Sequence, residues 1–161
     1  MTWVIIGAGA LVMLLFFGNQ VAAGVISFAP WEGSSVDGSQ VPPNVLAIAQ
    51  AIAQAEGFYV SGALPQRQNN PGDLSNASGI MTFSDMAAGW RALYGQINLM
   101  ISGGSHVYSP TDTITQISQK WTTDVPPGAQ ANWAANVARS LGLTPDNTFL
   151  DVGSNISQVI T

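Results

Sequence analysis

Hydrophobic positions follow two different patterns along this chain. From Trp3 to Phe28 they form one apolar stretch, broken chiefly by Asn19 and Gln20. From about residue 45 onward they recur at every third or fourth position, a spacing typical of helices that bury one face. The sequence therefore predicts an apolar N-terminal segment followed by a mainly α (α+β) domain with a short β-hairpin.

The N-terminal stretch is long enough to cross a membrane. At about 1.5 Å per residue, a helix over residues 3–28 exceeds a bilayer core of roughly 30 Å. Trp3 and Trp31 flank it, where interfacial aromatic side chains are favoured. Small residues at 21–24 allow a cleaved signal peptide instead, but no Lys or Arg precedes the apolar run. We predict an uncleaved single-pass transmembrane helix at 1–29, which binds the lipid bilayer and leaves the C-terminal part extracytoplasmic.

Four helices are predicted after a flexible Gly/Ser/Pro linker at 30–43. They span about 45–56, 85–101, 113–121 and 130–141, and a short turn ends near Leu150. Asn44 and Ser84 are the predicted N-caps of the first two helices. Two extended pieces, 69–74 and 79–83, predict a small hairpin or irregular loop. The predicted folded domain covers 44–150, and a polar tail covers 151–161.

The composition narrows the chemistry that this domain can carry. Charged residues make up 8% of the chain, with a formal net charge of −5. Its four basic residues are scattered, so we predict no nucleic-acid partner. The absence of cysteine excludes disulfides, thiolate metal sites and a cysteine nucleophile. The single histidine, His106, has no Asp or second His nearby in sequence, and no metal or cofactor is implied.

Glu56 is one of two glutamates and ends the first predicted helix. Val45, Ile48, Ala49 and Ile52 mark the buried face of that helix, and Glu56 lies four positions beyond Ile52. At ~100° per residue, Glu56 points within about 40° of this face. Burial and the negative end of the helix dipole both raise the pKa of a glutamic acid there. A protonated Glu56 can act as a general acid, whereas a purely packing role at the helix end is the alternative.

The sequence around Glu56 carries a resemblance to a known family. The matching pieces are Ala-Ile-Ala-Gln-Ala-Glu56-Gly57-Phe58 and Leu-Pro-Gln-Arg67-Gln-Asn69-Asn70-Pro71-Gly72-Asp73-Leu74, with further similarity at 88–93, 117–121 and 132–142. Together they resemble lysozyme-like muramidases, most closely phage-type and lytic-transglycosylase-like domains. The resemblance covers about 45–150, nearly the whole predicted domain.

This resemblance implies a small helical domain that binds the glycan strand of peptidoglycan in a cleft. Glu56 would be the catalytic acid, and Asn69 and Asn70 would lie across the cleft, where amides both donate and accept hydrogen bonds. Phe58, Asp73 and Trp133 complete the predicted substrate-binding set. The chain departs from many lytic transglycosylases in two places. Gly57 replaces a serine after the glutamate, and Trp133 occupies the stretch where a tyrosine is common.

Two reaction outcomes follow from the number of carboxyl groups. Hydrolases usually place two carboxylates around the glycosidic bond, and Asp73 and Asp85 are the candidates for the second. A lytic transglycosylase needs one, because Glu56 first gives its proton to the bond between N-acetylmuramic acid and N-acetylglucosamine and then accepts one from the C6 hydroxyl. A chain so poor in acidic residues favours the second mechanism.

Two classes of function remain from the sequence. The first is a membrane-anchored peptidoglycan-cleaving enzyme, in a cell envelope or in the virion of a bacteriophage with an internal membrane, where it opens the wall locally. The absence of basic residues before the apolar stretch favours the virion. The alternative is a non-catalytic peptidoglycan-binding or structural protein that retains the fold.

Overall fold

A computed structural model describes residues 13–14, 41–123, 125–126 and 128–153. Most of the predicted anchor, linker and tail therefore lies outside the described residues. The two described residues of the predicted anchor, Met13 and Leu14, form strand β1 (Met13–Leu14) and not part of a helix. Within the described ranges, no helix has both the length and the apolar character that a membrane crossing requires.

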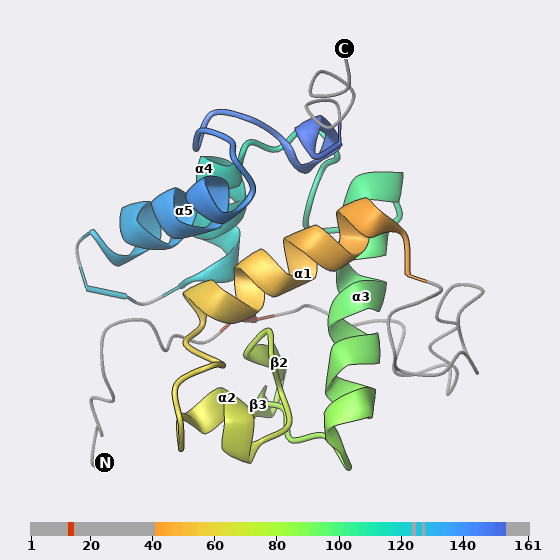
Figure 1. Ribbon diagram of the computed structural model, residues 1–161, viewed down its shortest axis with the longest axis vertical. Helices are drawn as coiled ribbons and strands as arrows, with labels where there is room; N and C mark the ends of the chain where they lie inside the picture. The colour runs from red at the N-terminus through yellow and green to blue at the C-terminus, as the bar shows by residue number, and fades with distance from the viewer. Residues whose placement is uncertain (1–12, 15–40, 124, 127, 154–161) are drawn as a thin grey trace.

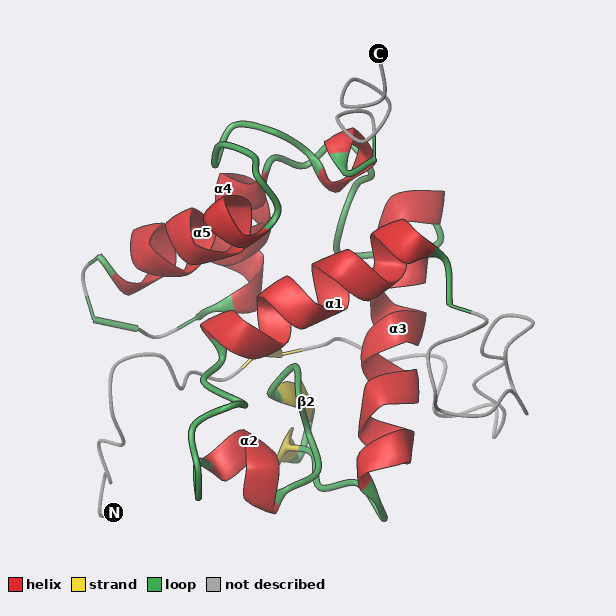
Figure 2. Cartoon of the chain, in the orientation of Figure 1, coloured by secondary structure: helices red, strands yellow, loops and turns green. Residues whose placement is uncertain are grey.

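The described chain is mainly helical (Figures 1 and 2). Its helices are α1 (Pro43–Ala55), α2 (Leu64–Arg67), α3 (Met86–Ser102), α4 (Ile114–Trp121), α5 (Ala129–Ser140) and the 3-10 helix η2 (Phe149–Asp151). The four helices predicted from periodicity are confirmed, each within two residues of its predicted ends. The sequence did not predict α2, which is a single turn with a proline in its first positions.

A small sheet lies on one side of α1. Strands β2 (Leu74–Asn76) and β3 (Gly79–Ile80) form an antiparallel hairpin, and β1 pairs parallel to β2 on its other edge. The predicted hairpin is confirmed, but an extended piece over 69–73 is wrong. Asn69 and Asp73 adopt positive φ angles of 53° and 49°, so this segment turns and does not run as a strand.

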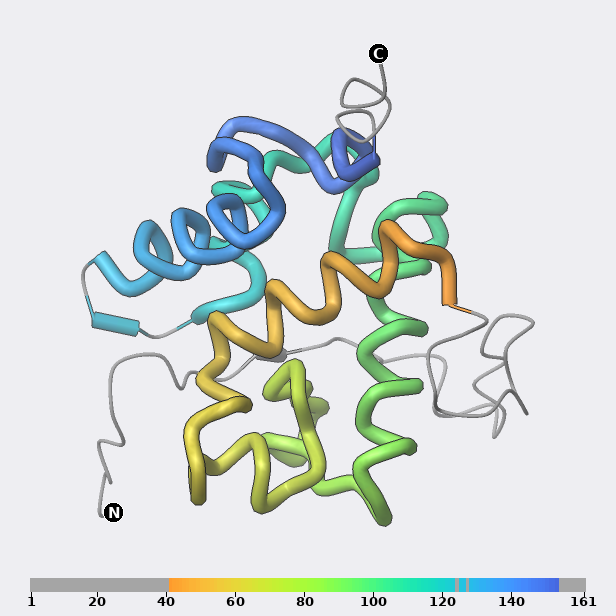
Figure 3. Tube along the Cα trace, in the orientation of Figure 1, coloured from red at the N-terminus to blue at the C-terminus, as the bar shows by residue number. Residues whose placement is uncertain are grey.

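Helix α1 is the centre of the domain. It crosses between α3 on one side and α5, which packs on α4, on the other (Figure 3). Its predicted buried face is confirmed, since Val45, Ile48 and Ile52 expose no surface. The neighbouring helices contribute Leu93, Ile97, Met100, Ile114, Ile117 and Val137 to the same core. Because each such buried side chain contributes about 1.5–3 kcal/mol, this cluster fixes where the end of α1 lies.

Two predicted helix caps are wrong. Asn44 lies inside α1, whose N-cap is Pro42, and no side chain caps that end. Pro43 opens the helix instead, where its fixed φ is favourable and its missing N–H costs nothing. At α3 the cap is Asp85 and not Ser84. The carboxylate of Asp85 accepts a hydrogen bond from the Ala88 N–H at 2.8 Å, while Ser84 donates to Asp85.

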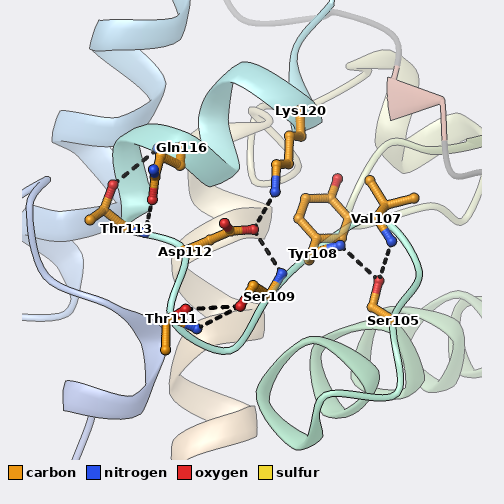
Figure 4. Close-up of polar contacts among 9 residues, drawn as sticks. All are labelled: Ser105, Val107, Tyr108, Ser109, Thr111, Asp112, Thr113, Gln116 and Lys120. Carbon is orange, nitrogen blue, oxygen red and sulfur yellow. Dashed lines mark hydrogen bonds and ion pairs between the residues drawn. The ribbon is translucent and has the colours of Figure 1, made fainter.

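The segment between α3 and α4 is held by its own polar side chains (Figure 4). The Ser105 hydroxyl accepts the backbone N–H groups of Val107 and Tyr108, and Asp112 accepts the Ser109 N–H and pairs with Lys120. Thr113 and Gln116 close a reciprocal capping box at the start of α4. These contacts set the position of α4 and therefore of Trp121 at its end.

Candidate functional site

Glu56 is the C-cap residue of α1 and is buried, with 3% of its surface exposed. The predicted orientation of this side chain toward the core is therefore confirmed. The chain turns away immediately afterwards at Gly57, whose φ of +72° suits glycine. The end of α1 thus delivers one carboxyl group into the interior between α1, α4 and α5.

Two indole groups hold one oxygen of this carboxyl. Trp121 from α4 and Trp133 from α5 donate their Nε1–H groups to Glu56 Oε1, at 2.9 and 2.8 Å. Their rings stack with centroids 5.7 Å apart, and both are buried. Trp133 belonged to the predicted substrate-binding set, and the structure places it beside the carboxyl as a donor. Trp121 was predicted only as core, although a buried indole N–H needs an acceptor.

The other oxygen of Glu56 has a different environment. Oε2 is buried and has no hydrogen-bond partner among the described residues. The two indole bonds use both acceptor sites of Oε1. We therefore expect the proton of the neutral acid on Oε2, where no other protein group in the described ranges competes for it.

The pKa of Glu56 is raised well above its ordinary value, as the sequence predicts from burial. Loss of solvation is the largest cause, the negative charge of Asp73 adds to it, and the two indole bonds act against it. Asp73 itself exposes no surface, and burial raises the pKa of its carboxyl to about 6. Both of its oxygens lack a hydrogen-bond partner within the described part of the chain. Of the two candidate second carboxyls, Asp73 is therefore the one whose charge acts on Glu56.

Asn70 and Asn69 hold the turn that carries Asp73. The Asn70 amide is fully buried and binds backbone only, donating to the carbonyls of Leu74 and Met81 and accepting the Leu74 N–H. Asn69 donates to the Phe83 carbonyl at 3.1 Å. The α3 backbone approaches this turn so closely at Gly89 that an added Cβ would lie 1.8 Å from the Asn69 carbonyl oxygen. Both predicted substrate amides thus have structural partners.

Aromatic side chains from α3 and from the turn after α1 form a separate row. Phe58 is buried and meets Trp90 and Tyr59 edge-on, with centroids 5.5 and 5.3 Å away, and Trp90 stacks on Tyr94. Tyr59 is 57% exposed, so this row of rings reaches from the interior to the surface. Phe58 was predicted as a substrate contact, and the structure shows it packed among these rings.

The remaining acidic candidate lies elsewhere. Asp85 is exposed at the start of α3, and its bond to the Ala88 N–H lowers the pKa of its carboxyl.

Comparison with protein-family models, with curated proteins and with solved structures found no match for this chain. The arrangement of Glu56, its two indoles and Asp73 is therefore interpreted from its own chemistry.

Proposed function

We propose that this chain cleaves the glycan strand of peptidoglycan, with Glu56 as the acid and then the base of a lytic transglycosylase. One observation carries the proposal: Glu56 is buried and held through Oε1, while its Oε2 has no hydrogen-bond partner among the described residues. A general acid needs a proton that survives near neutral pH and that can move to a substrate oxygen. The raised pKa supplies the first property, and at Oε2 no protein group of the described ranges competes with a substrate oxygen for the proton.

In the proposed reaction, Glu56 Oε2 gives its proton to the glycosidic oxygen as the bond from C1 of N-acetylmuramic acid to that oxygen breaks. The substrate's N-acetyl group stabilises the positive charge that develops at C1. The C6 hydroxyl oxygen then bonds to C1, and its proton passes to Glu56. The products are a 1,6-anhydro sugar and a free C4 hydroxyl, and Glu56 ends in the protonated form in which it began.

The two indole bonds suit an acid that must also become a base. They stabilise the carboxylate when the proton has left, since bonds to a charged acceptor are stronger than bonds to a neutral one. They also fix the orientation of the carboxyl group on rigid helices, which keeps Oε2 in one place through both steps.

Hydrolysis is the second candidate outcome, and the action of the Asp73 charge on Glu56 supports it. A hydrolase would use this second carboxyl against water or the sugar, and the products would be reducing-end muramic acid. Asp85, exposed at the cap of α3, does not fit that role. The fold supports either outcome, being mainly helical with a small hairpin beside the first helix, as the resemblance to lysozyme-like domains implies.

The setting forms part of the proposal and rests on the sequence. The apolar stretch at 3–28 supports attachment to a lipid bilayer beside the wall, in a cell envelope or in a virion with an internal membrane. Such attachment would confine cleavage to wall near the membrane.

Mass spectrometry of purified peptidoglycan after incubation with the full chain tests this function. We expect anhydro-muropeptides from the parent chain and from Glu32→Gln, the matched change at the other glutamate, and none from Glu56→Gln. Reducing-end products that depend on Glu56 would establish a hydrolase. No release by any folded chain would overturn the enzymatic function and favour a wall-binding protein.

A further inference from the structure

Three carboxyl oxygens are buried in the site without a hydrogen-bond partner in the described ranges: Glu56 Oε2, Asp73 Oδ1 and Asp73 Oδ2. Buried polar groups are normally satisfied, and the negative charge of Asp73 acts on Glu56, so two carboxylates here would repel each other. The arrangement is tolerable when the two groups are not charged together. The site therefore favours a state in which at least one of the two carboxyl groups is protonated.

The chain maintains Asp73 in this position at a conformational cost. Its φ of +49° is unfavourable for a residue with a side chain, although Asp tolerates it better than most. The three bonds of the buried Asn70 amide close the turn around it, and the backbone N–H of Asp73 donates to the Asn70 carbonyl at 3.1 Å. An unpaired carboxylate buried in this turn does not stabilise the fold, and an apolar side chain in its place would stabilise it more.

The groups that act on Glu56 come from three elements and differ in sign. Trp121 of α4 and Trp133 of α5 face it with neutral N–H groups, which favour the carboxylate. From the turn that precedes β2, Asp73 contributes a negative charge, which favours the protonated acid. Within the described ranges, Asp73 is the one charged side chain whose charge shifts the pKa of Glu56.

We propose that Asp73 is a positioning residue of the Glu56 site, whose negative charge keeps the proton on Glu56 until a substrate oxygen takes it. This inference rests on the proposed function and assigns a role to a residue that need not touch the reacting atoms. The same charge makes the Glu56 carboxylate a stronger base after proton transfer. Asp73 thus promotes the return of a proton from the C6 hydroxyl, which the second step of a lytic transglycosylase requires.

The ionisation of Glu56 can be followed directly, because the chain has only two glutamates, Glu32 and Glu56. Labelling glutamate with ¹³C gives two side-chain carboxyl signals from the full chain in a detergent that keeps it monodisperse. In Asp73→Asn the titration midpoint of Glu56 is expected to move to lower pH, while that of Glu32 stays. The matched control Asp146→Asn removes an exposed aspartate and should leave both midpoints where they are.

Folding of each variant is checked by the indole N–H signals of Trp121 and Trp133. If Asp73→Asn does not fold, Asp73→Gly removes the same charge with a residue that accepts positive φ freely. A Glu56 midpoint that stays in place, or moves to higher pH, in the folded variant overturns the inference.

The pH dependence of cleavage provides the second readout. Loss of the protonated acid sets the alkaline limb of kcat, so this limb should move to lower pH in Asp73→Asn. Abolished cleavage with an unmoved Glu56 midpoint would assign Asp73 to direct contact with substrate or water, against the inference. If no variant or parent cleaves peptidoglycan, the proposed function fails, while the titration without substrate still decides whether Asp73 controls the proton on Glu56.

Discussion

The carboxyl groups of this domain lie in two regions, and their surroundings shift the pKa in opposite directions. On the surface, Asp85 and Asp151 accept backbone N–H groups at helix starts, and these bonds lower the pKa of each. In the interior, Glu56 and Asp73 leave three oxygens without partners in the described ranges, and burial raises both pKa values. The surface groups stabilise the fold when charged, whereas the interior pair is strained when charged.

The difference separates structural acids from candidate catalytic ones. A capping carboxylate strengthens the structure that holds it, so its position needs no further explanation. A buried acid with unpartnered oxygens weakens the folded state at neutral pH, and such groups are common at functional sites. Replacing an aspartate by asparagine should therefore destabilise the domain at the surface and stabilise it in the interior.

The largest effect is expected from Glu56→Gln. The amide cannot donate an acidic proton, so the rate of peptidoglycan cleavage should fall by about a thousandfold or more, in line with the contribution of a general acid. The folded state should be kept, because the amide oxygen can still accept the two indole bonds. Cleavage rates and thermal melts of the same samples measure both. Loss of the folded state in this variant would make Glu56 a structural residue.

Asp73→Asn should stabilise the domain above pH 6. The pKa of Asp73 rises from its ordinary value of 3.8 to about 6 on folding, which corresponds to about 3 kcal/mol at higher pH. A raised pKa means that stability is fully present below pH 4 and is lost as the pH increases through 6. The advantage of the amide should therefore grow between pH 4 and pH 7, as measured by denaturant unfolding at several pH values.

The free energies of unfolding of the parent and Asp73→Asn should converge well below pH 4, where Asp73 is protonated in both the folded and the unfolded state. A variant that is less stable than the parent by the same amount at every pH would show that Asp73 makes a neutral packing contribution and carries no charge penalty.

Trp133→Phe tests the hydrogen bond that lowers the pKa of Glu56 and so acts against the charge of Asp73. Loss of one N–H donor removes a bond that lowers the pKa of Glu56, so the alkaline limb of the activity profile should move to higher pH. Loss of a hydrogen bond to the charged form should also slow cleavage by about tenfold. Trp90→Phe is the matched control, because Trp90 packs on Phe58 and Tyr94 and is not one of the two indoles that donate to Glu56. Equal shifts in both variants would contradict this role.

The smallest effect is expected from Asp112→Asn, at the surface region shown in Figure 4. Its ion pair with Lys120 is partly exposed, and such pairs contribute less than about 1 kcal/mol. The amide oxygen can still accept the Ser109 N–H, so we expect a slight destabilisation that disappears in high salt. A stabilised Asp112→Asn variant would remove the contrast with Asp73.

Helix positions and the burial of Glu56 were predictable because they depend on local periodicity. Spacing at three and four residues identifies the inner face of α1, and the same rotation carries Glu56 to that face. The caps at Asn44 and Ser84 were predicted wrongly, since proline and aspartate next to each of them provide competing ways to begin a helix.

The environment of Glu56 was decided only by tertiary structure. Trp121 and Trp133 lie 65 and 77 residues away in the sequence, and periodicity marks each as buried without saying what its N–H contacts. Asp73 reaches the site through a turn at positive φ that the sequence suggests as extended. The sequence determined that an acid would be buried at the end of α1, because helix geometry is local. Which donors and which charge surround it depended on how α4, α5 and the hairpin pack, because hydrogen bonds and Coulomb forces act between neighbours in space.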